Sequence, residues 1–248
     1  MSNGLHMIRL VFGDLLALQR FARAQRLPEH PFDADYVVHC ALGQLFAEQA
    51  PHPFLQRARG RVVEVLGYSQ QDKQSLQEHA QAYAMPEVWS LVDWNRIDSK
   101  PMPKRWPIEK RLGFYTRACP LVRGPRGHGR EVETKKARPE VDAYLAHLWQ
   151  KDTARPREEV YRGWLARELS RGGAAGLVQA TLRGFQLKRL LRHDGDRKSR
   201  TITRPDVRFQ GLLEVNDSDA FTALLTRGLG RHRAFGFGML LLYPRRHA

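Results

Sequence analysis

The amino-acid sequence predicts an α+β fold built from two related halves. Short apolar segments typical of strands alternate with segments whose apolar residues recur at helical spacing, both before and after a basic middle region. This order suits antiparallel sheets that carry helices on one face. Hydrophobic residues make up 42% of the 248 residues, so a core can form and the composition argues against wholesale disorder.

The first half is expected to span residues 1–120. Alternating or continuous apolar character predicts strands at residues 8–12, 61–68, 88–92 and 113–120. Helical spacing predicts helices at residues 15–27 and 72–84, and a third that starts near 31–35 and continues over 36–49.

The second half is expected to span residues 121–248 and to contain an arginine-rich helical insertion at about residues 121–175. The insertion starts with a basic stretch at 123–138 and continues into helices at 139–151 and 156–171. After it we expect strands at 181–191 and 207–215 joined by a basic loop at 192–204, a helix at 218–226 and a closing strand at 239–243.

The charge balance indicates a polyanionic partner. A formal net charge of +15 exceeds what solubility requires, and nucleic acid is the default partner for such an excess. An anionic membrane surface is the alternative, but the sequence has neither an apolar run of spanning length nor a lysine-rich amphipathic helix. We therefore expect no membrane partner.

Cysteine usage indicates a cytoplasmic protein. The two cysteines, Cys40 and Cys119, exclude a disulfide framework, and neither has a partner at the spacing of metal ligands. Residues 1–7 lack the basic and apolar regions of a secretion signal. We expect no structural zinc.

A basic, glycine-punctuated loop at residues 227–238 is the most informative motif. It lies between a predicted helix and a predicted strand, which is not the strand-loop-helix order of nucleotide-binding loops. Glycines let the backbone approach a phosphate closely, and Arg227, Arg231 and Arg233 supply positive charge. The loop therefore indicates RNA binding; the alternative is that its glycines serve only a tight helix-to-strand turn.

The sequence resembles the CRISPR repeat-processing endoribonucleases of the CasE (Cse3) type. The residues that carry this resemblance are Phe209, Gly211, Leu213, Val215 and Asp217, followed by Gly228, Gly230, Arg233, Ala234, Gly236 and Gly238. Residues 36–46 are similar to the first helix of the family, and residues 114–123 are similar to one of its strands. The longer arginine-rich region departs from the common type and suits a divergent relative such as a repeat processor of type IV systems.

The resemblance implies two tandem ferredoxin-like halves, similar to RNA-recognition motifs. Members of the family bind a stem-loop in the CRISPR repeat transcript and cut at its 3′ base without a metal or other cofactor. The ribose 2′-hydroxyl attacks the neighbouring phosphorus and leaves a 2′,3′-cyclic phosphate. The resemblance also implies that the protein stays on the crRNA hairpin, with other CRISPR effector-complex subunits as partners.

His39 is the expected general acid or base, because it matches the histidine of the family's first helix and titrates near neutrality. Tyr36 lies three residues earlier on the same helix face and is a second candidate. Arg23 could supply charge to the phosphorane. The alternatives are a packed histidine, a core tyrosine and a solvated arginine.

A defined set of basic residues and glycines is expected to contact RNA. The set comprises Arg117, Arg123, Lys135, Lys136, Arg138, Arg155, Arg157, Arg162, Arg167, Arg171, Arg231, His232 and Arg233, with Gly228, Gly230, Gly236 and Gly238. The arginines of residues 155–171 could lie along the major groove of an RNA hairpin, which is lined by phosphates. Alternatively they form a solvated face paired with Glu158, Glu159 and Glu168.

Two other functions stay open at this level. The protein could be a catalytically silent RNA-binding subunit with the same fold. It could also be a generic basic RNA-binding or ribosome-associated protein, which would not prefer a repeat hairpin over other duplex RNA.

Overall fold

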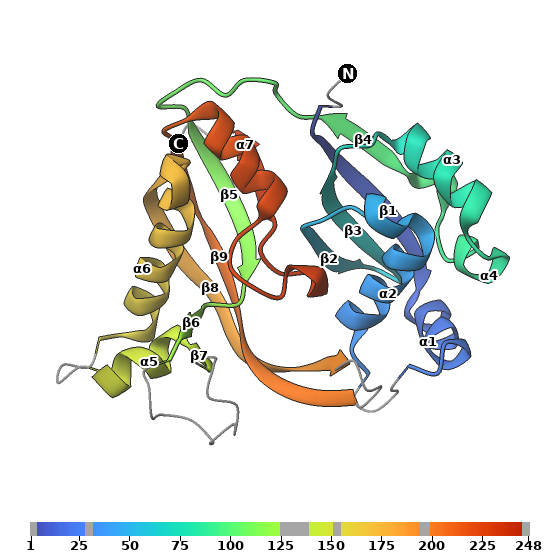
Figure 1. The fold of residues 1–248 in the computed structure, drawn as a ribbon, viewed down its shortest axis with the longest axis horizontal. Helices are drawn as coiled ribbons and strands as arrows, with labels where there is room; N and C mark the ends of the chain where they lie inside the picture. The colour runs from blue at the N-terminus through green and yellow to red at the C-terminus, as the bar shows by residue number, and fades with distance from the viewer. Residues whose placement is uncertain (1–3, 28–31, 125–138, 151–154, 194–198, 245–248) are drawn as a thin grey trace.

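Two four-stranded antiparallel sheets stand side by side in the computed structural model (Figure 1). The structure describes residues 4–27, 32–124, 139–150, 155–193 and 199–244. Within these ranges, no helix combines the length and the apolar character needed to cross a membrane.

The first half has the strand and helix order of a ferredoxin-like unit. Its elements are β1 (His6–Asp14), α1 (Leu15–Ala24), α2 (Ala34–Phe46), β2 (Phe54–Arg59), β3 (Val62–Ser69), α3 (Lys73–Tyr83), α4 (Pro86–Trp89) and β4 (Asp98–Pro101). The sheet order is β2-β3-β1-β4, with antiparallel neighbours throughout. Asp14 and Asp72 begin α1 and α3 by accepting hydrogen bonds from Ala17 and Ser75 backbone N–H groups at 2.8 and 2.9 Å.

The second half repeats this topology. Its elements are β5 (Arg111–Ala118), β6 (Leu121–Arg123), β7 (Glu140–Asp142), α5 (Ala143–Gln150), α6 (Arg157–Ser170), β8 (Ala175–His193), β9 (Ser199–Val215), α7 (Ser218–Arg227) and β10 (Leu240–Pro244). Its sheet order, β10-β5-β9-β8, corresponds strand for strand to that of the first half. The expected tandem ferredoxin-like architecture is confirmed.

Several short segments complete the secondary structure. Single 3-10 turns lie at Ala47–Gln49, Trp94–Arg96, Arg171–Gly173 and Arg233–Phe235. β6 and β7 form a separate two-stranded sheet beside α5.

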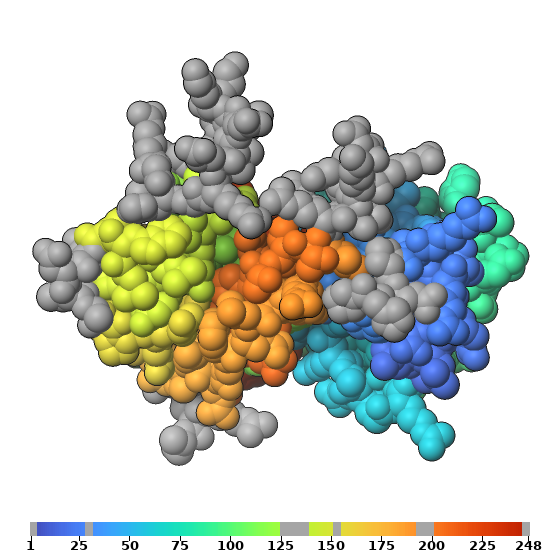
Figure 2. All heavy atoms as spheres, turned by 90° about the horizontal axis from the view of Figure 1, so that it is seen from below, coloured from blue at the N-terminus to red at the C-terminus, as the bar shows by residue number. Residues whose placement is uncertain are grey.

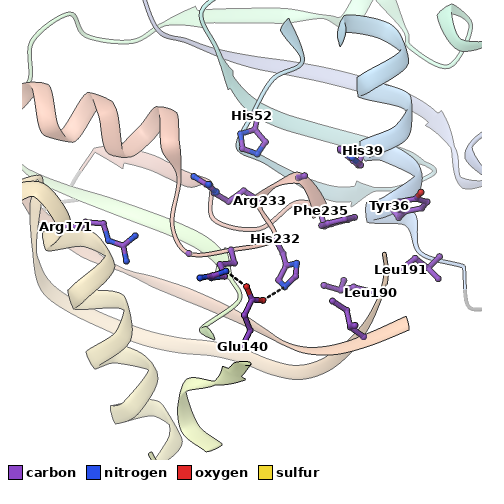
Figure 3. Close-up of a pocket in the computed structure, with 14 residues that line it drawn as sticks. Tyr36, His39, His52, Glu140, Arg171, Leu190, Leu191, His232, Arg233 and Phe235 are labelled. Carbon is purple, nitrogen blue, oxygen red and sulfur yellow. Dashed lines mark hydrogen bonds and ion pairs between the residues drawn. The ribbon is translucent and has the colours of Figure 1, made fainter. Parts of the chain in front are cut away.

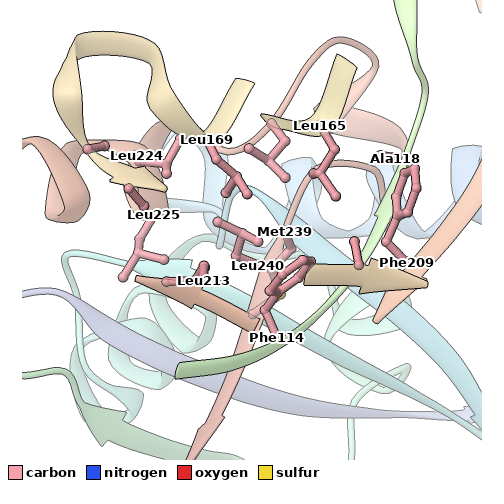
Figure 4. Packing of buried hydrophobic residues seen from close by; sticks show 14 of the residues in the cluster. Phe114, Ala118, Leu165, Leu169, Phe209, Leu213, Leu224, Leu225, Met239 and Leu240 are labelled. Carbon is pink, nitrogen blue, oxygen red and sulfur yellow. The ribbon is translucent and has the colours of Figure 1, made fainter. Parts of the chain in front are cut away.

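The two halves share part of their cores. One cluster lies beneath the helices of the first half and includes Phe12, Leu42 and Phe46. The other, drawn in Figure 4, fills the second half around Phe114 and Phe209. Leu55, Leu66 and Tyr68 from the first sheet belong to this second cluster, and the Tyr68 hydroxyl donates to the Leu240 carbonyl at 2.7 Å. The packing therefore fixes the position of one half against the other.

The ribbon of β8 and β9 extends beyond the second sheet and reaches the first half. Figure 2 shows it in orange between the α5–α6 region, in yellow, and the α1–α2 region, in blue. Lys188 of β8 pairs with Asp33 at 3.2 Å and with Asp35, both at the start of α2. The ribbon thus holds the N-terminal end of α2.

The domain boundary differs from the sequence prediction. β5, which the sequence places in the first half, pairs with β9 and β10 of the second sheet. We therefore propose that the boundary lies between residues 101 and 111 rather than at 120.

The arginine-rich region is not simply an excursion from the core. α6 takes the place of the first helix of the second ferredoxin-like unit, and its side chains Tyr161, Trp164, Leu165 and Leu169 are buried. Only β6, β7 and α5, with the undescribed residues beside them, are inserted between β5 and this helix.

Two local predictions are wrong, and several short strands were not predicted. Residues 88–92 do not form a strand, because Pro86 starts the short helix α4 and only Val92 bridges to Phe12. The strands β2, β4, β6 and β7 were not predicted. Most of the expected basic loop at 192–204 is strand, since β8 continues to His193 and β9 begins at Ser199.

Candidate functional site

A cleft of about 760 Å³ opens where the two halves meet. Its walls come from α2 and the segment before β2 in the first half, and from the glycine-rich loop, β7 and β8 in the second (Figure 3). The two strongest motifs of the sequence, the helix with Tyr36 and His39 and the glycine-rich loop, therefore line one cleft.

Helix α2 presents Tyr36 and His39 to the cleft from a single face. The residues are three positions apart, and their ring centroids are separated by 6.4 Å. Phe235 of the glycine-rich loop packs against both, with its ring centroid 6.1 Å from that of Tyr36 and 5.4 Å from that of His39. This aromatic contact joins the two halves at the floor of the cleft.

The environment gives Tyr36 and His39 different proton chemistry. Burial lowers the pKa of His39, so its ring is neutral near neutral pH and can accept a proton. Burial, with a contribution from the Cys40 thiol, raises the pKa of Tyr36 to about 12. Tyr36 therefore keeps its hydroxyl proton and can act as a hydrogen-bond donor.

The glycine-rich loop is shaped by close backbone packing. Gly228, Gly230, Gly236 and Gly238 all have positive φ angles. A Cβ at Gly238 would lie 2.2 Å from the Leu229 carbonyl oxygen, and one at Gly230 would lie 2.8 Å from the Trp164 ring. The turn itself therefore requires these glycines, which agrees with the interpretation that they serve a tight helix-to-strand turn.

Glu140 of β7 lies among several basic residues at one side of the cleft. Its carboxylate forms an ion pair with Arg231 and lies 3.9 Å from both the His232 ring and the Arg204 guanidinium. The Arg204 guanidinium also donates to Nε2 of His232 at 3.4 Å. His232 is therefore engaged in a network, while Arg233 donates to the Arg227 carbonyl.

His52 is a cleft residue that the sequence analysis missed. It lies on the segment that leads into β2, and its backbone N–H donates to the Tyr68 carbonyl at 2.7 Å. Partial burial lowers its pKa, with further contributions from the charge of Arg233 and from His39 when that ring is protonated. No local spacing marks this residue, because its place beside His39 depends on how the sheet and the two halves pack.

Arg23 and Arg117 are among the predicted site residues that lie outside the cleft. Arg23 is exposed at the end of α1 and does not line the cleft. Arg117, predicted to contact RNA, is only 7% exposed. Its guanidinium donates two hydrogen bonds of 2.9 Å to Asp206 and lies 2.8 Å from Asp35, so its role in this structure is to hold the two halves together.

The arginines of the α6 region divide into two groups. Arg157 stacks on the rings of Tyr144 and Phe185, 4.1 and 4.2 Å from their centroids, and Arg155 and Arg171 pair with Glu159 and Glu168. Among the residues that the structure describes, the exposed Arg162 and Arg167 have no ion-pair partner. The paired-face interpretation therefore applies to Arg155 and Arg171, and RNA contact by Arg162 and Arg167 stays a prediction.

Other predicted contacts are spread over the surface. Arg123, Arg155 and Arg167 line a smaller groove of about 300 Å³ between α5, α6 and β6, whereas Arg171 reaches the main cleft. Lys135, Lys136 and Arg138 lie outside the described residues. Within the described ranges, no three His, Cys, Asp or Glu side chains are grouped so that they could hold a metal ion.

Comparisons with known proteins agree with this architecture. A family model described as "CRISPR associated protein" matches residues 15–244. The CRISPR endoribonuclease Cse3 bound to a 19-nucleotide RNA is similar in structure, with a TM-score of 0.63, 20% identity, and coverage of 97% of this chain and 100% of that one. No curated protein matches the sequence.

Two further solved structures show the same fold. The CRISPR-associated protein Cas6e from Escherichia coli K-12 has a TM-score of 0.59 and 20% identity, over 96% of this chain and 99% of that one. A chain of a CRISPR RNA-guided surveillance complex has a TM-score of 0.56 and 17% identity, over 96% and 98%. Sequence identities this low show a common fold only. Any statement about the chemistry therefore depends on the residues of the site.

Proposed function

The chain belongs to the CRISPR associated protein family, and we propose that it is an endoribonuclease that binds the stem-loop of CRISPR repeat RNA and cleaves the precursor into mature crRNA. The proposal includes metal-independent cleavage by attack of the ribose 2′-hydroxyl. The similar solved structures support it, since one is named as an endoribonuclease bound to RNA.

One observation carries the proposal: the cleft unites proton-transfer groups with positive charge. His39 and Tyr36 come from α2, whereas Arg231 and Arg233 come from the loop of the other half. Cleavage by a 2′-hydroxyl needs a proton acceptor, a proton donor and positive charge near the phosphorane. A cleft of about 760 Å³ has room for nucleotides around a scissile phosphate.

The chemistry follows from the protonation states. Neutral His39 takes the proton of the 2′-hydroxyl as the oxygen attacks phosphorus. The bond between phosphorus and the 5′-oxygen breaks, and the 5′-oxygen takes up a proton from a proton donor in the cleft or from water, which gives a 2′,3′-cyclic phosphate and a 5′-hydroxyl. Tyr36, which keeps its proton, donates a hydrogen bond to a phosphate oxygen. Arg233 offsets negative charge on the phosphorane.

RNA outside the cleft is proposed to follow exposed arginines. Arg162 and Arg167 of α6 and Arg123 of β6 lie on the second half and can contact phosphates of the hairpin stem. By likeness to the chain of a surveillance complex, we propose that the protein stays on the 3′ hairpin as a subunit of an effector complex.

The test is cleavage of a repeat RNA from the matching CRISPR array in EDTA. Wild-type protein is expected to cut at the 3′ base of the stem, and a 2′-deoxy substitution at the scissile ribose is expected to block the cut. His39→Ala should slow cleavage roughly 100- to 10,000-fold and retain hairpin binding. His79→Ala is the matched control, since His79 lies on α3 and packs against Tyr83 away from the cleft.

The same experiment separates the alternatives. Hairpin binding without cleavage by the wild-type protein would identify a silent structural subunit. Equal affinity for the hairpin and for unrelated duplex RNA would identify a generic RNA-binding protein.

A further inference from the structure

Three histidines line the cleft: His39, His52 and His232. They differ in whether their rings have hydrogen-bond partners within the protein. The His232 ring accepts a hydrogen bond from Arg204 and lies 3.9 Å from Glu140, so it is held within the protein. Among the described residues, none forms a hydrogen bond with the ring nitrogens of His39 or His52. These two imidazoles are available to a substrate.

We propose that His52 is a second catalytic residue, which protonates the leaving 5′-oxygen while His39 accepts the proton of the 2′-hydroxyl. This assignment rests on the proposed ribonuclease function. Both histidines line the same cleft from the first half, and Figure 3 shows their rings on its upper side with Phe235 below them. The two roles require two proton-transfer groups that face one phosphodiester from different positions.

The segment that carries His52 is rigid enough for such a role. Pro51 and Pro53 flank the residue and restrict its backbone. Two backbone hydrogen bonds hold the segment against β3. The His52 N–H donates to the Tyr68 carbonyl at 2.7 Å, and the Tyr68 N–H donates to the Pro53 carbonyl at 3.2 Å. A positioned proton donor needs this kind of support, because small displacements of a catalytic group cost large factors in rate.

Contacts with the glycine-rich loop bring His52 beside the charge that the reaction needs. A Cβ at Gly228 would come within 2.8 Å of the Pro53 ring, and one at Gly236 within 3.4 Å of the Phe54 ring. The loop therefore packs directly against the segment of His52. Arg233 of this loop is close enough to His52 to act on it electrostatically.

The charge at Arg233 also favours the donor role. Burial lowers the pKa of His52, and the charge of Arg233 lowers it further, so the protonated form of this imidazole is a stronger acid. A bound phosphate near Arg233 offsets that cation and favours protonation of His52 before the reaction. His39, whose pKa is lowered by burial alone, is unprotonated and suits the acceptor role.

Two proton transfers accompany the proposed cleavage. The 2′-oxygen forms a bond to phosphorus as its proton moves to His39, and the bond between phosphorus and the 5′-oxygen breaks. The 5′-oxygen takes its proton from protonated His52. The products are a 2′,3′-cyclic phosphate and a 5′-hydroxyl, with His39 protonated and His52 neutral, and exchange with water restores both.

The test uses RNA in which sulfur replaces the bridging 5′-oxygen at the scissile phosphate. A thiolate leaves without protonation, so this substrate does not need the general acid. His52→Ala is expected to slow cleavage of ordinary RNA roughly 100- to 10,000-fold, to retain hairpin affinity, and to cleave the sulfur-containing RNA at nearly the wild-type rate. His39→Ala should be slow on both substrates, and His79→Ala should match wild type on both.

Two results would overturn the assignment while leaving the proposed function intact. One is wild-type cleavage of ordinary RNA by His52→Ala; the other is an equal defect of His52→Ala on both substrates, which would indicate a positioning or structural role. If the wild-type protein binds the hairpin but cleaves neither substrate, the proposed ribonuclease function fails, and the assignment of His52 fails with it.

Discussion

The ring of Phe235, in the glycine-rich loop of the second half, stacks on the ring of Tyr36, on α2 of the first half, with 6.1 Å between the ring centroids. The same phenylalanine ring lies 5.4 Å from the centroid of His39. One aromatic side chain therefore ties the basic loop to the helix that carries the proposed proton acceptor.

Phe235→Ala is expected to slow cleavage while retaining hairpin binding. Removing the ring frees the loop from α2, and a displacement of about 1 Å at a reacting centre costs roughly 100-fold in rate. Single-turnover cleavage and hairpin affinity measured on the same preparation check this. Tyr83→Ala, at an aromatic residue that is 77% exposed, is the control. An unchanged cleavage rate for Phe235→Ala would show that the stacking does not position the site.

Asp206→Asn is expected to destabilise the fold at neutral pH. Asp206 accepts two hydrogen bonds of 2.9 Å from the buried Arg117, and breaking a buried pair of this kind costs about 3 kcal/mol. The free energy of unfolding, measured with urea at pH 7, checks this. Asp219→Asn, at an exposed position, should stay within about 0.5 kcal/mol of wild type.

The same carboxylate predicts a pH dependence of stability. Burial alone would raise the pKa of Asp206, but the hydrogen bonds and charge of Arg117, with Gln186, hold it below its ordinary value. Because the folded-state pKa lies below the unfolded-state value of about 3.9, the stabilisation is present above that value and is lost as the pH falls through the folded-state pKa. Below about pH 4, wild type should therefore lose more stability than Asp206→Asn. Parallel curves for the two proteins would contradict this.

The double variant Arg162→Gln with Arg167→Gln is expected to weaken the salt dependence of hairpin binding. Both side chains are exposed on α6, and each phosphate contact with a duplex contributes about 0.9 to the slope of log affinity against log salt concentration. The slope should therefore fall by roughly 1 to 2 units in a titration over several salt concentrations.

Arg157→Gln provides the comparison for this titration. Its guanidinium stacks between Tyr144 and Phe185, so its loss should lower thermal stability and leave the salt slope unchanged. An unchanged slope for the double variant would mean that α6 does not contact the RNA backbone.

Local patterns predicted most elements of this fold. Helical spacing with an N-terminal aspartate marked α3 and α7, and apolar runs marked β1, β3 and β10. The pattern misled where apolar residues served a short helix, as at Val88, and where a basic segment continued as paired strand, as in β8 and β9. The helical spacing of apolar residues in α6 predicted a helix there. It could not indicate that this helix is the first helix of the second ferredoxin-like unit, because that role depends on how the helix packs over β8.

The sequence by itself determined most of the helices and the longer strands, the shared helix face of Tyr36 and His39, and the turn that requires the glycines of residues 228–238. These features depend on residues that are neighbours along the chain. Only the tertiary structure decided that His52 joins His39, that Phe235 covers Tyr36, and that Arg117 is enclosed by Asp35 and Asp206. The physical reason is that these partners meet across the seam between two sheets, where strand pairing and core packing choose the contacts.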